Sequence, residues 1–255
     1  MLTVLSPAKK LDSENCVVEG SPHSTCSFLD SSNQLVQNLK KLGPETLGSL
    51  MNISDNLAIL NWERYQNWTI PFKNHNSRQA MYSFKGDTYA GFNAKTLSAE
   101  EVLFCQENTR ILSGLYGILK PMDLIMPYRL EMGTKLKNKI GNDLYSFWGS
   151  SITKSLNEDL EKQQSKFIVN CASVEYFKVI NTDELNGTVI SPVFKEMKQG
   201  KAKIISFFAK KARGQMARFI VKNKIQDPSD ILSFNEDGYS YDSNLSEECY
   251  PVFIR

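Results

Sequence analysis

The sequence predicts an α/β fold of the mixed α+β type, in which helices flank a mixed central sheet within a single domain. Short apolar segments of strand length alternate with amphipathic segments of helix length, the order typical of such proteins. No internal repeat and no Gly/Ser-rich or Pro-rich linker divides the chain. Its 255 residues, 41% hydrophobic and 23% charged, have an ordinary globular composition. We therefore expect one domain spanning residues 1–255, long enough to bury its own core.

The first part of the chain should form a strand followed by two helices. Met1–Leu5 is expected to be a short buried strand, which a Ser-Pro pair ends because proline has no N–H to extend a ladder. The polar stretch Cys16–Thr25 is expected to be a surface loop. Asn33–Leu42 carries leucines at helical spacing and ends at Gly43-Pro44, and Ser54 can cap the helix that follows.

The rest of the chain continues this alternation. Residues Ser77–Phe84 lead into a strand, and Ser98 and Glu101 have the spacing of a capping box, which starts a helix that runs to about Arg110. Phe167–Cys171 is an apolar strand from which the chain turns into a helix. Four further elements are expected: strands at Val189–Phe194 and Lys203–Phe207, a helix at Phe208–Asn223, and an edge strand at Tyr250–Ile254.

Charge is distributed unevenly along the chain, although the net charge is only +2. Between Lys195 and Lys224 ten basic residues face a single acidic one, Glu196, which gives a local net charge of +9. From Ile225 to Arg255 the sign reverses, with seven acidic residues against Arg255 alone. Such asymmetry indicates either a polyanionic partner or pairing between the two segments.

The helix expected at Phe208–Asn223 has an apolar face and a basic face. One face carries Phe208, Ala212, Met216, Phe219 and Ile220 at helical spacing. The basic side chains are Lys211, Arg218 and Lys222, with Lys210 and Arg213 near the edges of that stripe. A helix that packs one side into a core and presents cations on the other suits a phosphate backbone, and an ordinary solvated face is the alternative.

A glycine-rich turn at Leu112–Pro121 follows the helix capped by Ser98. Gly114 and Gly117 near a helix end could expose backbone N–H groups as a nest for a phosphate, with Lys120 and Arg129 adding positive charge. The same pattern is similar to the turn of a helix-hairpin-helix element, which grips duplex backbone without reading bases. Two alternatives remain, an ordinary turn here and a rival hairpin turn at Leu42-Gly43-Pro44.

Polar groups also gather after the predicted strands, where ligands bind in open α/β sheets. Ser173 follows one strand and is first of all a helix-cap candidate, and Lys9 follows another. A general acid–base site could be built from such groups. The candidates for a polar pocket are Asp87, Tyr89, Glu131, Ser173, Glu175 and Tyr176. No nucleophile elbow, phosphate-binding P-loop or GxGxxG motif specifies a reaction, so we leave catalysis open and incline against it.

Cysteine and histidine usage argues against a zinc site. The five cysteines form no CxxC pair, and the two histidines, His23 and His75, lie in polar stretches. We therefore expect no cofactor and no bound metal, although carboxylate ligands leave this open. The chain opens without a signal-peptide layout and has no apolar run of roughly 20 residues, so we expect a reduced, cytoplasmic protein without membrane contact.

Together these motifs resemble the bacterial peroxide stress protein YaaA family, from Met1 to about Tyr239. The matching segments are Ser6–Leu11, Arg78–Phe92, Leu112–Gly133, Asp143–Trp148, Asn170–Lys178 and Ser206–Val221. The resemblance implies an unusual α/β fold with a basic cleft and a helix-hairpin-helix element. It also implies duplex-DNA binding and protection against the damage that peroxide does with free iron, and it implies no established reaction.

Carried onto this chain, the resemblance implies that eight cations line the DNA-binding cleft: Lys9, Lys120, Arg129, Lys178, Lys210, Lys211, Arg213 and Arg218. Lys10 departs from the family pattern, and the acidic segment from Glu236 onward matches it least. Our first hypothesis is therefore a monomer that binds duplex DNA through its backbone and protects the cell against peroxide. The alternatives are an enzyme acting on a phosphorylated or nucleotide-like small molecule and, third, direct iron sequestration.

Overall fold

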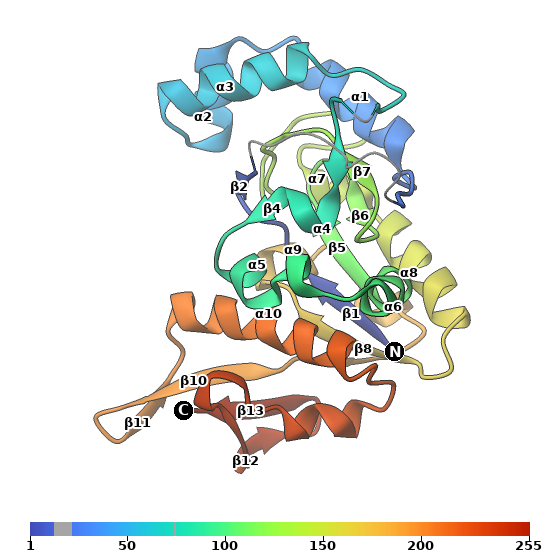
Figure 1. Cartoon of the computed structure of the whole chain (residues 1–255). Helices are drawn as coiled ribbons and strands as arrows, with labels where there is room; N and C mark the ends of the chain where they lie inside the picture. Colours follow the sequence, from blue (N-terminus) through green and yellow to red (C-terminus); the bar gives the residue numbers. More distant parts are fainter. Residues whose placement is uncertain (13–21, 74) are drawn as a thin grey trace.

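A computed structural model describes residues 1–12, 22–73 and 75–255, and it confirms a mixed α/β fold in a single domain (Figure 1). The predicted loop at Cys16–Thr25 lies mostly outside these residues. The central sheet has the strand order β6-β5-β1-β8-β9, in which all strands but β6 run parallel. Its strands are β1 (Leu2–Leu5), β5 (Thr109–Ser113), β6 (Gly117–Leu119), β8 (Phe167–Cys171) and β9 (Thr188–Ile190).

A second sheet has the order β11-β10-β13-β12. Its strands are β10 (Val193–Lys198), β11 (Lys201–Lys203), β12 (Ser240–Glu247) and β13 (Tyr250–Ile254). The strand expected at Val189–Phe194 is divided between the two sheets, because Pro192 separates β9 from β10 and cannot donate to a ladder. The strand predicted at an edge, β13, instead pairs with β10 on one side and β12 on the other.

Helix α10 (Ser206–Lys222) lies between the two sheets and packs closely against α5 (Asp87–Phe92) (Figure 1). Glycines make this approach possible. A Cβ built on Gly91 would lie 2.2 Å from the Lys211 carbonyl oxygen, and one on Gly214 would lie 1.8 Å from the Thr88 carbonyl oxygen. Helix α10 is thus a central packing element of the fold, although side chains of its first turns, such as Lys210, are exposed.

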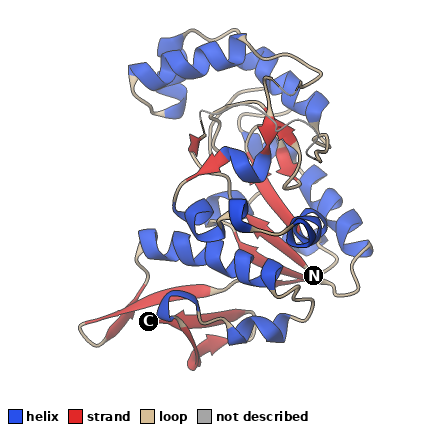
Figure 2. Cartoon of the chain, in the orientation of Figure 1, coloured by secondary structure: helices blue, strands red, loops and turns tan. Residues whose placement is uncertain are grey.

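Three helices, α1 (Leu29–Leu39), α2 (Pro44–Met51) and α3 (Asp55–Gln66), form one end of the molecule (Figure 2). The turn at Gly43 does join two helices, as expected, with proline at the first position of α2. Helix α6 (Ala99–Asn108) begins with both hydrogen bonds of the predicted capping box.

Three local predictions are wrong, the first of them only in part. The segment Ser77–Phe84 does lead into a strand, β4 (Phe84–Lys85), but residues 80–83 form a helical turn, α4 (Ala80–Ser83), that separates β4 from the short strand β3 (Arg78–Gln79). The glycine-rich turn joins β5 to β6, so it is a β-hairpin and not a helix-hairpin-helix element. A strand was expected at Lys203–Phe207, but the observed strand, β11, ends at Lys203, and α10 already begins at Ser206.

The remaining elements are β2 (Lys10–Leu11), β7 (Leu124–Ile125), α7 (Leu144–Trp148), α8 (Ser151–Glu161), α9 (Val174–Phe177), and the short 3-10 helices η1 (Ala94–Thr96), η2 (Thr182–Glu184), η3 (Pro228–Ser233) and η4 (Glu236–Gly238). The helices of the described chain are each too short or too polar to cross a bilayer.

Candidate functional site

The carboxyl edge of the central sheet is a topological switch point. The chain leaves β1 toward β5 and leaves β8 toward β9, so the strand order reverses between β1 and β8. Ligands bind at such points in open α/β sheets. Ser6 follows β1 and Ser173 follows β8, and the backbone N–H of Ser173 donates to Ser6 Oγ at 2.8 Å. The Tyr89 hydroxyl donates to the Ser6 carbonyl oxygen at 3.1 Å.

Acidic and basic groups from the sequence prediction meet at this edge. Glu131 accepts from Lys9 at 2.6 Å and from Arg129 at 3.2 Å. Glu175 accepts from the backbone N–H of Gly133 at 3.0 Å. The structure therefore brings these candidates together, but Lys9 and Arg129 both form ion pairs with Glu131. Arg129 Nε is buried and has no hydrogen-bond partner among the described residues.

The remaining polar candidates play structural parts. Ser173 caps α9 by accepting from the Tyr176 N–H, as expected of a helix-cap candidate. Burial raises the pKa of Tyr89 and of Tyr176 well above the usual value, so both phenols stay protonated at neutral pH. Asp87 begins α5, and within the described chain no hydrogen bond or ion pair joins it to the other candidates.

The glycines expected to form a phosphate nest are buried. A Cβ on Gly114 would lie 2.4 Å from the Leu130 carbonyl oxygen, and one on Gly117 would lie 2.8 Å from the Trp148 ring. Gly117 also has a φ of +71°, which favours glycine at this hairpin turn. Both glycines serve packing, and no exposed nest forms at this turn, all of whose residues are described.

The predicted single cleft of eight cations is divided. Lys120 follows β6, beside the amino-terminal end of β5, and with Arg110 and Asp159 it lines a cavity of about 110 Å³. It therefore lies at the opposite end of the sheet from Lys9. The two cannot belong to one cleft at the carboxyl edge.

Two cations of α10 are also committed to internal contacts. Lys211 pairs with Asp237 of η4 at 2.7 Å. Arg218 donates to the carbonyl oxygens of Phe92 and Asn93, at 3.2 and 3.0 Å, and so holds the end of α5. The expectation that both side chains are free for a partner is wrong, because α10 is enclosed between layers that supply acceptors.

A second group of cations has no such partners in the part of the chain that the structure describes. Lys198, Lys201 and Lys203 lie on the β10–β11 hairpin, whose two-residue turn, Gln199-Gly200, has the positive φ angles that favour tight hairpins. The hairpin projects from the second sheet (Figure 1). Three more cations, Lys178, Lys210 and Arg213, lie on α10 and just after α9. We call the following six the basic surface: Lys178, Lys198, Lys201, Lys203, Lys210 and Arg213.

Within the described chain, none of these six cations forms an ion pair within 4 Å. Glu196 faces Lys203 across the hairpin, but Arg255 holds its carboxylate at 2.9 Å. Lys178 lies over the Tyr145 ring, 5.2 Å from its centroid. Exposed apolar side chains accompany the cations: Met197 is 52% exposed and Phe207 is 55% exposed. The hairpin lysines were counted in the basic segment but not assigned to a site, although Gln-Gly between two lysines indicates a hairpin.

A cavity of about 470 Å³ opens into the basic surface. It lies between the ends of β8 and β9, helix α9 and the second sheet. Lys178 and Arg213 line it together with Asn170, Ser191 and apolar side chains, and no lining residue in the described chain is acidic. Cys171 lies close to Arg213, yet burial raises the pKa of its thiol to about 12, so it is no thiolate at neutral pH.

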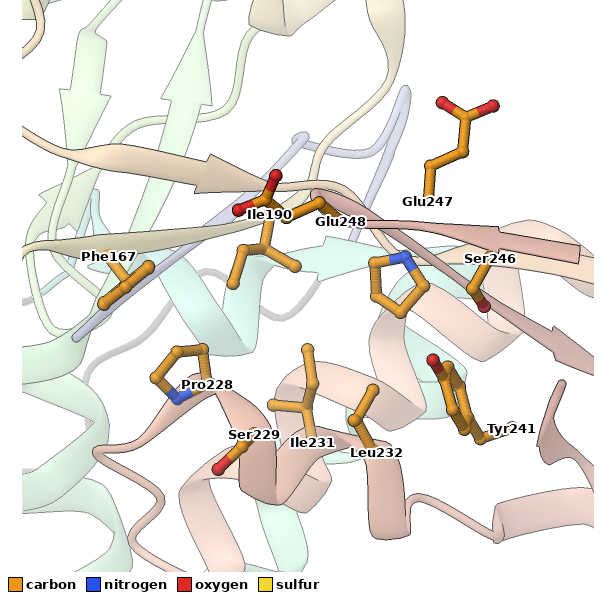
Figure 3. Close-up of a pocket in the computed structure, with 11 residues that line it drawn as sticks. Phe167, Ile190, Pro228, Ser229, Ile231, Leu232, Tyr241, Ser246, Glu247 and Glu248 are labelled. Carbon is orange, nitrogen blue, oxygen red and sulfur yellow. The ribbon is translucent and has the colours of Figure 1, made fainter. Parts of the chain in front are cut away.

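The acidic C-terminal segment forms a cavity of the opposite character, of about 400 Å³ (Figure 3). Its lining is largely apolar, including Ile190, Pro228 and Tyr241. Glu247 and Glu248 also line it, and none of the described lining residues is basic. The acidic segment contacts the basic segment mainly through Asp237, which forms an ion pair with Lys211. Pairing between the two segments therefore neutralises Lys211 but not the six cations of the basic surface.

The described residues contain no group of three or more His, Cys, Asp or Glu side chains placed to hold a metal ion. Buried thiols are also unreactive: burial raises the pKa of Cys105 to about 12 and that of Cys26 well above its usual value. Cys16 lies outside the described residues.

Fold and site together define an α/β protein with a polar switch point and a separate, uncompensated basic surface. Residues 1–245 match the family described as peroxide stress protein YaaA, and the chain belongs to this family. It is 49% identical over 255 residues to a UPF0246 protein of Teredinibacter turnerae, covering 100% of this chain and 99% of that one. UPF0246 proteins of Polynucleobacter necessarius and Cupriavidus metallidurans are 51% and 50% identical, over 100% of this chain and 98% of each relative. The family's name supports a role in peroxide stress.

Proposed function

We propose that this protein binds duplex DNA through the phosphate backbone at the basic surface, and that this binding serves protection against peroxide. The observation that supports the proposal is the division among the cations. Lys9, Arg129, Lys211 and Arg218 are held by internal acceptors, whereas the six cations of the basic surface have no ion-pair partner in the described chain. Uncompensated charge of one sign on one surface attracts a polyanion.

The shape of the basic surface also suits a duplex. A two-stranded β-ribbon is narrow enough to enter the major groove of DNA, and the lysines at its tip would contact phosphates on either side. Lys210 and Arg213 would contact the backbone from the start of α10. Lysine contacts to phosphates carry no base readout, so we expect little sequence preference.

The test compares single charge reversals by fluorescence anisotropy with a labelled duplex. Lys201→Glu should weaken binding roughly tenfold or more at low salt, equivalent to about 1.4 kcal/mol. The matched control is Lys154→Glu, an exposed lysine on α8, on the other side of the molecule (Figure 1), which should bind like the wild type. Equal affinities for wild type and Lys201→Glu would refute the proposed surface.

The rival turn at Gly43 is tested in the same assay. Lys41 is exposed beside this turn. If Lys41→Glu weakens duplex binding and Lys201→Glu does not, the helical end formed by α1 to α3 is the contact surface instead.

A second candidate is an enzyme acting on a phosphorylated small molecule at the switch point. Arg129 Nε favours it, since a buried donor without a partner among the described residues, on a side chain that contacts Glu131, is the kind of group that a ligand oxygen satisfies. The internal pairing of Lys9 and Arg129 with Glu131 weighs against it. Phosphorus NMR of the protein with mixed nucleotides would detect turnover, and Glu131→Gln should abolish any that is found.

A further inference from the structure

We propose that the cavity lined by Lys178 and Arg213 is a binding pocket for a single nucleotide. The phosphate would lie against the two cations and the base against the apolar wall. If the nucleotide belongs to a DNA strand, this proposal rests on the proposed DNA binding. If it is a free mononucleotide, the same contacts would bind it and the proposal stands without DNA binding. At about 470 Å³ the cavity is within the range of small-molecule sites, roughly 300–1,000 Å³.

The cationic end of the cavity is ready for an anion. Arg213 is half-buried and has no ion pair or hydrogen bond within the described chain, so its guanidinium can donate two parallel hydrogen bonds to a phosphate. Lys178 lies over the Tyr145 ring, 5.2 Å from its centroid, and forms no ion pair within 4 Å among the described residues. Asp143 is an acidic group whose pKa the charge of Lys178 affects. That pKa is lowered mainly by hydrogen bonds from Ser146, whose N–H donates to the Asp143 carboxylate at 2.8 Å as the cap of α7, and less by Lys178.

The other walls of the cavity suit a flat, apolar base with polar edges. Phe177 and Tyr250 offer aromatic surface, on which a base can stack. Val174 is 84% exposed and Ile204 is 60% exposed, so the lining of the cavity includes apolar surface that a bound base could cover. Asn170 donates to Ser191 Oγ at 3.2 Å, which leaves the Ser191 hydroxyl hydrogen free for an acceptor on the base.

Two sources of the nucleotide follow from where the cavity opens. A strand bound along the basic surface passes over the mouth, because Lys178 and Arg213 belong to both the surface and the cavity. Extruding a base from a duplex costs the free energy of unstacking and unpairing it, which the phosphate contacts of the strand can offset. A free mononucleotide enters without that cost.

The experiment uses the full chain and two probes. Deoxyadenosine monophosphate is titrated by calorimetry, with deoxyadenosine as the probe that lacks the phosphate. A duplex containing 2-aminopurine, whose fluorescence rises when the base leaves the stack, reports extrusion. We expect saturable binding of the monophosphate, at least tenfold tighter than that of the nucleoside.

The variants are Val174→Glu, which adds a negative charge at the mouth, and Leu103→Glu as matched control. Leu103 is 65% exposed on α6, so both substitutions should leave the fold intact. Val174→Glu should weaken monophosphate binding at least tenfold, and Leu103→Glu should not change it. Equal effects of the two variants would overturn the pocket assignment.

The outcomes separate this pocket from the proposed DNA binding. Monophosphate binding together with a rise in 2-aminopurine fluorescence supports a DNA strand as the source, and monophosphate binding without that rise supports a free nucleotide. A duplex that binds without the rise, with no monophosphate binding, overturns the pocket and leaves DNA binding standing. Monophosphate binding without duplex binding overturns the DNA proposal alone, and absence of both overturns both.

Discussion

The contact between α5 and α10 gives the most quantitative prediction of the structure, through Gly214→Ala. The new Cβ would lie 1.8 Å from the Thr88 carbonyl oxygen and 2.8 Å from the Phe92 backbone nitrogen. Both are backbone atoms, so no side chain can rotate away. The helices would have to separate by roughly 1.5–2 Å to reach ordinary contact distances.

Overpacking of this kind costs about 3 kcal/mol, the upper end of its usual range, because the whole of α5 must move. Alanine's higher helix propensity returns about 1 kcal/mol at most. We therefore expect a net loss of roughly 2 kcal/mol or more, a Tm lower by about 4–8 °C for a chain of this size. The assay is thermal melting followed by circular dichroism.

The matched control for this substitution is Gly43→Ala, since a Cβ on Gly43 meets no atom of the described residues within 4 Å. It should lower the Tm by no more than a few degrees, the loss expected at a helix N-cap. If Gly214→Ala melts with or above Gly43→Ala, the close packing of α10 against α5 is incorrect, and α10 would again be a candidate surface helix.

Three further predictions concern stability and reactivity. Arg218→Glu should lower the melting temperature more than Lys154→Glu, because it places a carboxylate against the carbonyl oxygens that Arg218 now satisfies; equal melting would contradict this. Arg110→Ala should cost about 3–5 kcal/mol in urea unfolding at pH 7, since it leaves buried Asp159 without its 2.6 Å partner; a loss below about 1 kcal/mol would show that the pair is exposed. Peroxide should leave Cys171 unmodified in the native protein, as its raised pKa keeps the thiol protonated, whereas urea-unfolded protein should be oxidised there; mass spectrometry distinguishes the two.

The sequence predicted the elements whose signals are local. The strand Phe167–Cys171 was expected at its observed bounds, and the capping box at Ser98 and Glu101 placed the start of α6 correctly. In both cases neighbouring residues carry all the information, through apolar patterning and cap chemistry.

The errors arose where tertiary partners decide. Helix α10 carries a basic stripe that indicates exposure, yet the layers around it supply Asp237 and two backbone carbonyl oxygens to Lys211 and Arg218. The charge asymmetry does indicate that the two segments could pair, but nothing near Lys211 and Arg218 in the sequence identifies these particular partners. Likewise, Gly114 and Gly117 suit either a nest or a β-hairpin, and only the pairing of β5 with β6 decides between them.

The candidate site was predicted in part for the same reason. Groups that follow parallel strands, such as Ser6 and Ser173, meet because the topology places the carboxyl ends of β1 and β8 side by side. Lys120 follows an antiparallel strand and therefore lies at the other end of the sheet. Strand direction depends on pairing across the whole chain, so the sequence alone could not separate Lys120 from the other cations.

The salt dependence of duplex affinity tests the central claim most directly. If the six cations of the basic surface each contact one phosphate, the logarithm of the association constant should fall against the logarithm of the salt concentration with a slope of about −5. Lys201→Glu should reduce the size of that slope by about 1, and Lys154→Glu should leave it unchanged. A duplex affinity that does not depend on salt, or a slope that Lys201→Glu leaves unaltered, would contradict phosphate binding at this surface.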